Sequence, residues 1–343
     1  MLKSPQVFFP ATISDTTTQQ WEFSFSPDGK TLFYATDKPR RIVVQRWNGS
    51  RWSGPAALMP QLESDHGGVS VAPDGRNLFF SWSRDGRPRD LYQLQLGRSD
   101  AKPMQLTDTP LTGEISLSSD RTGRGFLWTD RQLGGGGGLG FFRTRLQGTG
   151  VFVEGPADEV GSGANSPFVD PGGRFVLFAR YGTSKTKEDL FLSELRDGVP
   201  LAPVPLGDVV NGDFNDTSPQ LSSDGRFLLF SSDRPAGSGA PGDYQIWHMP
   251  TAAIPVLKAA LALRTNETNP FATPHAGPIV TSSKLRKQDG IQVLAETGKP
   301  FTGIVEDRHA NKKLEARRSL VDGRVQGVWL KWYGTGALSD YSK

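Results

Sequence analysis

A short unit recurs along the first 250 residues of this 343-residue chain and limits the folds open to it. It reads FSFSPDGKTLFYATD at residues 23–37, VSVAPDGRNLFFSWS at 69–83, PFVDPGGRFVLFARY at 167–181 and PQLSSDGRFLLFSSD at 219–233. With a degenerate copy between the second and the third of these, the residues before the turn are Ser26, Ala72, Ser118, Asp170 and Ser222. Their spacings are 46, 46, 52 and 52 residues, and a period of this size is typical of a propeller or a solenoid.

One copy of the unit contains the pattern of a four-stranded antiparallel sheet. Residues 23–26 alternate apolar and polar side chains, as does a strand with one buried face. The Pro-Asp-Gly that follows supplies the dihedral angles and the side-chain acceptor of a tight turn. Three further strands are expected at residues 31–37, 41–47 and 51–59. Four such strands make one propeller blade.

The two ends of the repeated region predict how the ring closes. The fifth unit stops after its third strand, at residues 243–250, whereas residues 5–13 offer a spare strand before the first unit. We therefore predict an all-β fold with a propeller of five four-stranded blades, in which Gln6–Thr12 pairs beside Tyr244–Met249. Such closure removes the open sheet edges. The alternative is a propeller of six blades, with residues 251–290 as the sixth.

The third copy of the unit differs from the others. It reads SLSSDRTGRGFLWTD at residues 116–130, which predicts extra residues between Asp120 and the second strand.

After Pro250 the composition changes, which predicts three segments: a propeller (1–250), a short helix and Pro-rich linker (251–283), and a small C-terminal module of β-hairpins (284–343). Residues 281–343 carry twelve basic and seven acidic groups, whereas residues 1–280 carry 27 and 29. The basic balance thus belongs to the C-terminal module, which argues against nucleic acid as the partner of the whole protein.

Two families resemble parts of the chain. The SPDG(K/R)xLxF units, over residues 15–250, resemble TolB-type propeller repeats, although the third turn is disrupted and DPGG replaces SPDG in the fourth unit. The segments PFTGIV (300–305) and ANKKLEARRSLVDGRVQGVWLKWYGTGAL (310–338) resemble the MORN-like repeats of the YwqK antitoxin-component family, with ANKKL and GTGAL where that family shows ENGKL. The first resemblance implies a binding scaffold, often in the bacterial envelope, and the second a small stack of β-hairpins without catalytic activity.

Ligands of propellers usually meet the mouth of the central channel, where the innermost strands begin. The residues expected there are Trp21, Glu22, Asp65, His66, Glu114, Asn165, Asn215 and Asp216. Such an acidic, hydrogen-bonding rim would suit a cation with oxygen ligands such as Ca²⁺, a basic peptide or a polyol. The alternative is that these side chains satisfy backbone groups at strand starts and turns.

A second candidate surface lies in the C-terminal module. An aromatic cluster ringed by basic side chains would fit an acidic protein partner, and the residues that predict it are Arg317, Arg318, Trp329, Lys331 and Trp332. The alternative is that the tryptophans dock the module onto its own propeller.

These features favour a non-enzymatic scaffold that binds a protein or peptide. The chain has no cysteine, no GxSxG motif and no HExxH motif, which disfavours thiol, serine-hydrolase and zinc-protease chemistry. A propeller enzyme or lectin acting on glycans or lactones, and a toxin–antitoxin or interbacterial partner, are the alternatives. No cofactor, nucleic acid or membrane span is expected, and the oligomeric state is not indicated. A periplasmic or secreted location is expected if a signal peptide was removed, and a cytoplasmic one if Met1 is the native start.

Overall fold

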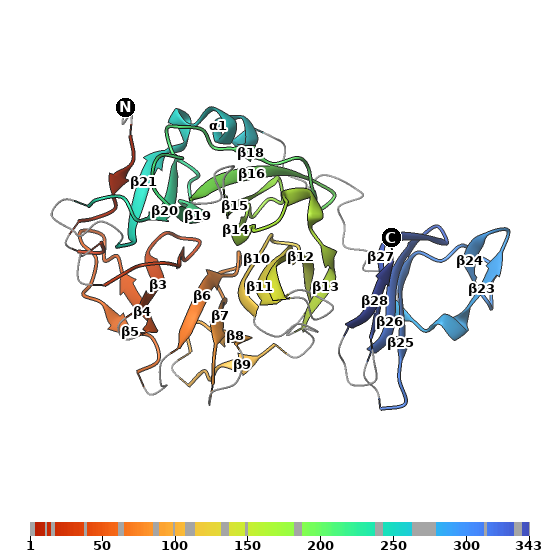
Figure 1. Ribbon diagram of the computed structural model, residues 1–343. Coiled ribbons are helices and arrows are strands. Elements are labelled where there is room, and N and C mark those ends of the chain that lie inside the picture. The colour runs from red at the N-terminus through yellow and green to blue at the C-terminus, as the bar shows by residue number, and fades with distance from the viewer. Residues whose placement is uncertain are drawn as a thin grey trace.

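The structure is a computed structural model of the chain, and it is built almost entirely of β-strands. It describes residues 4–10, 12–14, 18–37, 40–60, 65–84, 89–98, 100–106, 114–131, 137–147, 150–181, 187–236, 243–262, 279–311, 314–332 and 338–342. Five sheets surround a common axis, and a smaller β module follows them in the chain (Figure 1).

Each sheet of the ring is one blade, and its strands lie side by side in order from the axis outwards. Blade 1 contains β2 (Phe23–Phe25), β3 (Thr31–Asp37), β4 (Arg40–Arg46) and β5 (Ala56–Ala57). Blade 2 contains β6 (His66–Val71), β7 (Asn77–Trp82), β8 (Asp90–Gln95) and β9 (Met104–Gln105). Blade 3 contains β10 (Glu114–Ser119), β11 (Arg124–Arg131), β12 (Gly137–Gln147) and β13 (Gly150–Pro156). Blade 4 contains β14 (Asn165–Val169), β15 (Phe175–Tyr181), β16 (Glu188–Arg196), β17 (Val199–Pro200) and β18 (Val204–Pro205).

Blade 5 is completed by the N-terminus, as predicted. It contains β19 (Asp216–Leu221), β20 (Phe227–Ser232), β21 (Gln245–Pro250) and β1 (Gln6–Val7). Val7 lies opposite Trp247, and the Phe8 amide donates to the Ile246 carbonyl at 2.8 Å. The five-bladed ring is therefore confirmed. The six-bladed alternative is wrong, because the described part of residues 251–290 forms two 3₁₀ turns, the helix α1 (Pro255–Leu261) and strands of the C-terminal module.

In every blade, the turn after the innermost strand is closed by a hydrogen bond from a glycine amide to the carbonyl three residues before it. In blade 1 the Gly29 amide donates to the Ser26 carbonyl at 2.8 Å. In blade 3 the Gly123 amide donates to the Asp120 carbonyl at 3.1 Å, so Asp120 occupies the position of Ser26. The sequence-based alignment, which placed Ser118 there and expected inserted residues, is therefore wrong by two positions. The Asp120 carboxylate accepts from the amides at both ends of this shorter turn and so replaces the usual Pro-Asp-Gly chemistry.

Apolar side chains from neighbouring blades form the core. The cluster between blades 4 and 5 contains Phe175, Phe230 and Met249, and α1 covers it with Leu257 and Ala260. Helix α1 begins with Pro255, whose fixed φ suits the first helical turn.

The C-terminal module is a sheet with a separate hairpin. The sheet order is β22 (Ile279–Val280), β25 (Gly303–Arg308), β26 (Leu314–Val321), β27 (Arg324–Trp332) and β28 (Leu338–Ser342). The hairpin is β23 (Leu285–Gln288) with β24 (Ile291–Leu294), and β27 runs close to β13 of blade 3 (Figure 1). The side chains of Arg317, Trp329, Lys331 and Trp332 lie outside those described. The interface expected there stays a prediction.

Candidate functional site along the ring axis

A cavity lined by described residues lies on the ring axis, at the face where the innermost strands end in their turns. We call this the turn face and the cavity, of about 460 Å³, the turn-face cavity. All five blades line it, through the second residue of each turn: Pro27, Pro73, Arg121, Pro171 and Ser223. Leu261, the last residue of α1, adds an apolar side chain. The sequence predicted only a turn-forming role for these residues. In the structure they line an opening that a group from a binding partner could enter.

An ion pair holds α1 at the rim of this cavity. Arg174 pairs with Asp170 through Nη2 and Oδ1 at 2.6 Å, and its Nη1 donates to the Leu261 carbonyl at 2.8 Å. The hydrogen bonds that Arg174 donates to the Asp170 carboxylate raise the pKa of Arg174. Since the Asp170 side chain is almost fully buried, this rim is a fixed part of the fold.

A narrower space of about 20 Å³, the neck, continues the axis on the other side of Ser70 and Gln220, which line both cavities. One residue from each blade encircles the neck, always four positions before the first turn residue. These residues are Glu22, Gly68, Ser116, Ser166 and Ser218. This ring becomes visible only when blade 3 is aligned on Asp120.

The strand register breaks beside the neck residue in four of the five blades. In three of these blades the neck residue also has a positive φ angle, which is +63° for Gly68, +50° for Ser166 and +49° for Ser218. Both serines precede proline, and a positive φ is unusual for any residue with a side chain. Strained backbone of this kind gathers at functional sites.

Glu22 is the acidic member of the neck. Its carboxylate accepts a hydrogen bond from the Gly68 amide of the next blade. Burial raises the pKa of Glu22, and the Gly68 amide, Arg40 and Arg89 act in the opposite direction.

The residues predicted at the channel mouth of blades 1 and 2 lie where those strands begin, but most contact neighbouring side chains. Trp21 stacks on Tyr244 with ring centroids 4.4 Å apart. Asp65 pairs with Arg89 and, at 3.4 Å, with Arg40.

His66 is buried against Trp82, with ring centroids 5.0 Å apart. Burial, the largest cause, lowers its pKa to about 4.

The predicted mouth residues of blades 4 and 5 also contact neighbouring side chains. Asn165 donates to Glu188 at 2.8 Å, and Asn215 donates to Asp233 at 2.6 Å. Asp216 pairs with Arg234 and has no exposed surface.

Glu114 begins β10, and its side chain lies outside those described. Of the eight predicted mouth residues, Glu22 lines one of the described cavities. Ligand binding by the set as a whole stays a prediction, as does Ca²⁺ at the mouth. In the described part of the chain, no three His, Asp or Glu side chains form a group able to hold a metal ion.

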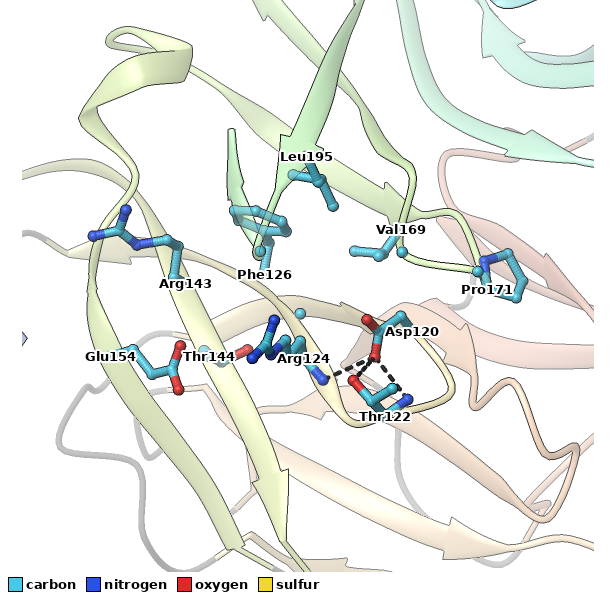
Figure 2. A pocket seen from close by; sticks show the side chains of 14 residues that line it. Asp120, Thr122, Arg124, Phe126, Arg143, Thr144, Glu154, Val169, Pro171 and Leu195 are labelled. Atoms are coloured by element: carbon cyan, nitrogen blue, oxygen red, sulfur yellow. Dashed lines mark hydrogen bonds between the residues drawn. The ribbon is translucent and has the colours of Figure 1, made fainter. Parts of the chain in front are cut away.

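A further small cavity, of about 30 Å³, lies between blades 3 and 4 (Figure 2). Asp120 projects into it and accepts from the Thr122 hydroxyl at 2.7 Å and the Arg124 amide at 3.0 Å. Arg124 Nε and the Thr144 hydroxyl are buried there without a protein partner. A space of this size with such groups fits a buried water, so we read it as part of the packing between blades.

No model of a known protein family matches the chain, and no curated protein sequence matches it. The structure is similar to TolB from Acinetobacter baumannii, with 15% identity and a TM-score of 0.44 over 68% of this chain, which spans 54% of that TolB protein. It is also similar to a chain in the crystal structure of a nidogen/laminin complex, with 14% sequence identity and a TM-score of 0.43. That match covers 62% of this chain and 74% of the other.

A third similar structure is a PQQ-bound aldose sugar dehydrogenase from Streptomyces coelicolor, with 12% sequence identity and a TM-score of 0.43. That match covers 72% of this chain and 98% of the other. Similarity at these levels carries no argument about function. No helix in the described residues is both long and apolar enough to cross a bilayer. The resemblance of the C-terminal module to MORN-like repeats stays a prediction.

Proposed function

We propose that this chain is a binding protein whose turn-face cavity captures a short extended segment of a partner protein. The observation that carries the proposal is the 460 Å³ space on the axis, lined by all five blades. Its volume lies within the range of about 300–1,000 Å³ usual for binding pockets. Its wall combines apolar side chains, such as Phe25 and Leu221, with serine hydroxyls, and this mixture suits a peptide better than a fully apolar ligand.

Two serine hydroxyls of the cavity join neighbouring blades, which favours a structural role for them over a catalytic one. Ser24 Oγ of blade 1 accepts from the Val71 amide of blade 2 at 3.0 Å. Ser118 Oγ of blade 3 accepts from the Val169 amide of blade 4 at 2.9 Å. Because these contacts join neighbouring blades, they keep the cavity wall rigid and lower the entropic cost of binding.

The proposal is tested by filling the cavity. Peptides selected on the wild-type protein from a displayed library are titrated against Ser70→Trp, which places an indole at the cavity floor, and Ser50→Trp, which places it on an exposed hairpin. We expect Ser70→Trp to weaken binding at least tenfold and Ser50→Trp to leave it unchanged, with both variants folded by circular dichroism. Equal binding to both variants would place the peptide site outside the cavity.

A further inference from the structure

Two serine hydroxyls in the neck are buried without a hydrogen-bond partner. Ser116 is 8% exposed and Ser218 is 7% exposed, and neither Oγ has a partner in the protein. Leaving a buried hydroxyl unpaired costs about 1–3 kcal/mol. Both belong to the ring of five residues around the neck, so a polar group that occupied the neck would satisfy them together.

The size of the neck restricts what such a group can be. A space of about 20 Å³ holds one group the size of a water molecule. A guanidinium plane or a carboxylate is too large, whereas a water molecule or an ammonium group fits.

The charge of the neck selects between these two groups. Glu22 is the carboxylate of the ring, and it shares the neck with the hydroxyls of Ser116, Ser166 and Ser218. The carboxylate only accepts hydrogen bonds, and each hydroxyl can accept as well as donate. An ammonium group brings three donors and a positive charge opposite to that of the carboxylate, whereas a water molecule brings two donors and no charge.

A metal ion fits this set less well than an ammonium group. Ca²⁺ takes about 6–8 oxygen ligands, usually with several carboxylates. The five ring positions supply one carboxylate.

We propose that the neck binds a primary ammonium group, presented by a lysine side chain that enters through the turn-face cavity. This inference rests on the proposed peptide binding and specifies its chemistry. The lysine stem would pass Ser70 and Gln220, which line both spaces, and its nitrogen would donate to Glu22, Ser116 and Ser218. Arg40 and Arg89 share the single carboxylate of Asp65 and also act on Glu22, so an ammonium group in the neck competes with them for the Glu22 carboxylate.

The test uses the full chain and a small probe, n-butylammonium, which mimics the lysine side chain. Binding is followed by NMR titration against n-butyltrimethylammonium, which keeps the charge but has no N–H donor, and against Ca²⁺. We expect n-butylammonium to bind in the millimolar range, at least tenfold more tightly than the trimethyl compound. Equal binding of the two, no binding of the primary amine, or its displacement by equimolar Ca²⁺ would overturn the proposal.

Variants of the neck give a second readout. Glu22→Gln is expected to weaken n-butylammonium binding at least tenfold, and the double variant Ser116→Ala/Ser218→Ala several-fold. Thr144→Ala, which removes a buried and unpaired hydroxyl in the small cavity between blades 3 and 4, outside both the neck and the turn-face cavity, is the matched control and should bind as the wild type. If Glu22→Gln fails to fold, the double variant decides. A double variant that binds n-butylammonium as tightly as the wild type would contradict the proposal.

Selected peptides separate this inference from the proposed function. Replacing the lysines of a bound peptide with arginine or acetyl-lysine should abolish its competition with n-butylammonium. Peptides that bind in the cavity but tolerate these replacements would leave the proposed function standing and the ammonium site refuted. Binding of n-butylammonium without any selected peptide would refute the proposed function alone.

Discussion

Arg234 Nη2 lies 3.0 Å from the Asp216 carboxylate, in a part of blade 5 where Asp216 has no exposed surface. The same guanidinium donates to the Val210 carbonyl at 2.7 Å and lies over the Phe230 and Trp247 rings. Even with this partner, burial raises the pKa of Asp216 to about 7, while Arg234 acts in the opposite direction. The stability of the ring therefore depends on pH.

The variant Asp216→Asn should flatten that dependence. The pKa of Asp216 is about 7 in the folded chain against an ordinary 3.8, so the unfolded chain loses its proton first. The wild-type free energy of unfolding should therefore fall as the pH rises between those values, by about 1.4 kcal/mol per unit of pKa shift. Urea titrations at a series of pH values measure the slope, and an equal slope in the variant would contradict the assignment.

The contribution of His66 to the pH dependence of stability should have the opposite sign to that of Asp216. Its pKa is lowered from 6.5 to about 4 by burial, so the unfolded chain takes up a proton first as the pH falls. Stability that is present above the ordinary value is lost as the pH falls from 6.5 towards 4. Since His66 Nε2 is buried without a partner, His66→Phe should retain the packing on Trp82 and reduce the loss in acid. If the wild type and His66→Phe unfold in acid with the same midpoint pH, protonation of His66 is not the cause of the acid unfolding.

Deleting residues 1–14 should destabilise the propeller strongly. The deletion removes β1 from blade 5 and the Ile13 side chain, which is 1% exposed, from the cluster beside Ile246. Loss of a buried isoleucine alone costs about 2–5 kcal/mol. Thermal unfolding followed by circular dichroism should show a much lower midpoint, whereas deletion of residues 1–4 is the control and should have little effect. A shortened chain that keeps its midpoint would mean that β1 does not close the ring in solution.

Replacing two glycines of nearly equal φ angle with alanine should destabilise the protein to different extents. Gly123 and Gly97 have φ angles of +82° and +79°. A Cβ on Gly123 would lie 2.7 Å from the Leu146 carbonyl oxygen, whereas a Cβ on Gly97 would meet no atom within 4 Å. We expect Gly97→Ala to cost about 1–2 kcal/mol from its conformation alone and Gly123→Ala clearly more. Similar unfolding midpoints in urea would argue against the close turn of blade 3.

Truncation at Thr281 tests the role of the C-terminal module. All strands of the five blades lie within residues 6–250, so we expect the shortened chain to stay soluble and to unfold cooperatively near the wild-type midpoint. Under the interface prediction it would lose partners bound through the module while it keeps peptides bound in the turn-face cavity. Aggregation or a much lower midpoint would show instead that the module covers the propeller, near β13 and β27.

The fold was largely predictable because its repeat is local. Alternating strands and Pro-Asp-Gly turns mark each blade, and the missing fourth strand of the last unit indicated how the ring closes. Blade 3 was misaligned because its turn has no proline and is one residue shorter. The Asp-x-x-Gly pattern that it shares with the blade 4 turn, where Asp170 accepts the same amide hydrogen bonds, was the signal that would have placed Asp120.

The candidate site was less predictable, for a reason that follows from that misalignment. Glu22 was identified, but Ser116 and Ser218 resemble ordinary strand residues until the five units are aligned in space. Several predicted mouth residues, such as Asp65 and Asp216, form ion pairs with arginines that are distant in sequence, and pattern alone does not reveal such pairs.

The pairing of Val7 with Trp247 also bears on biosynthesis. The first strand leaves the ribosome about 240 residues before its partner, which at about 5–20 residues per second is a delay of about 12–48 seconds. During this time Phe8 and Ile13 can pack only against blade 1, because Leu229 and Ile246 of blade 5, which complete their cluster, have not yet been synthesised. Closure of the ring therefore waits until the last blade has left the ribosome.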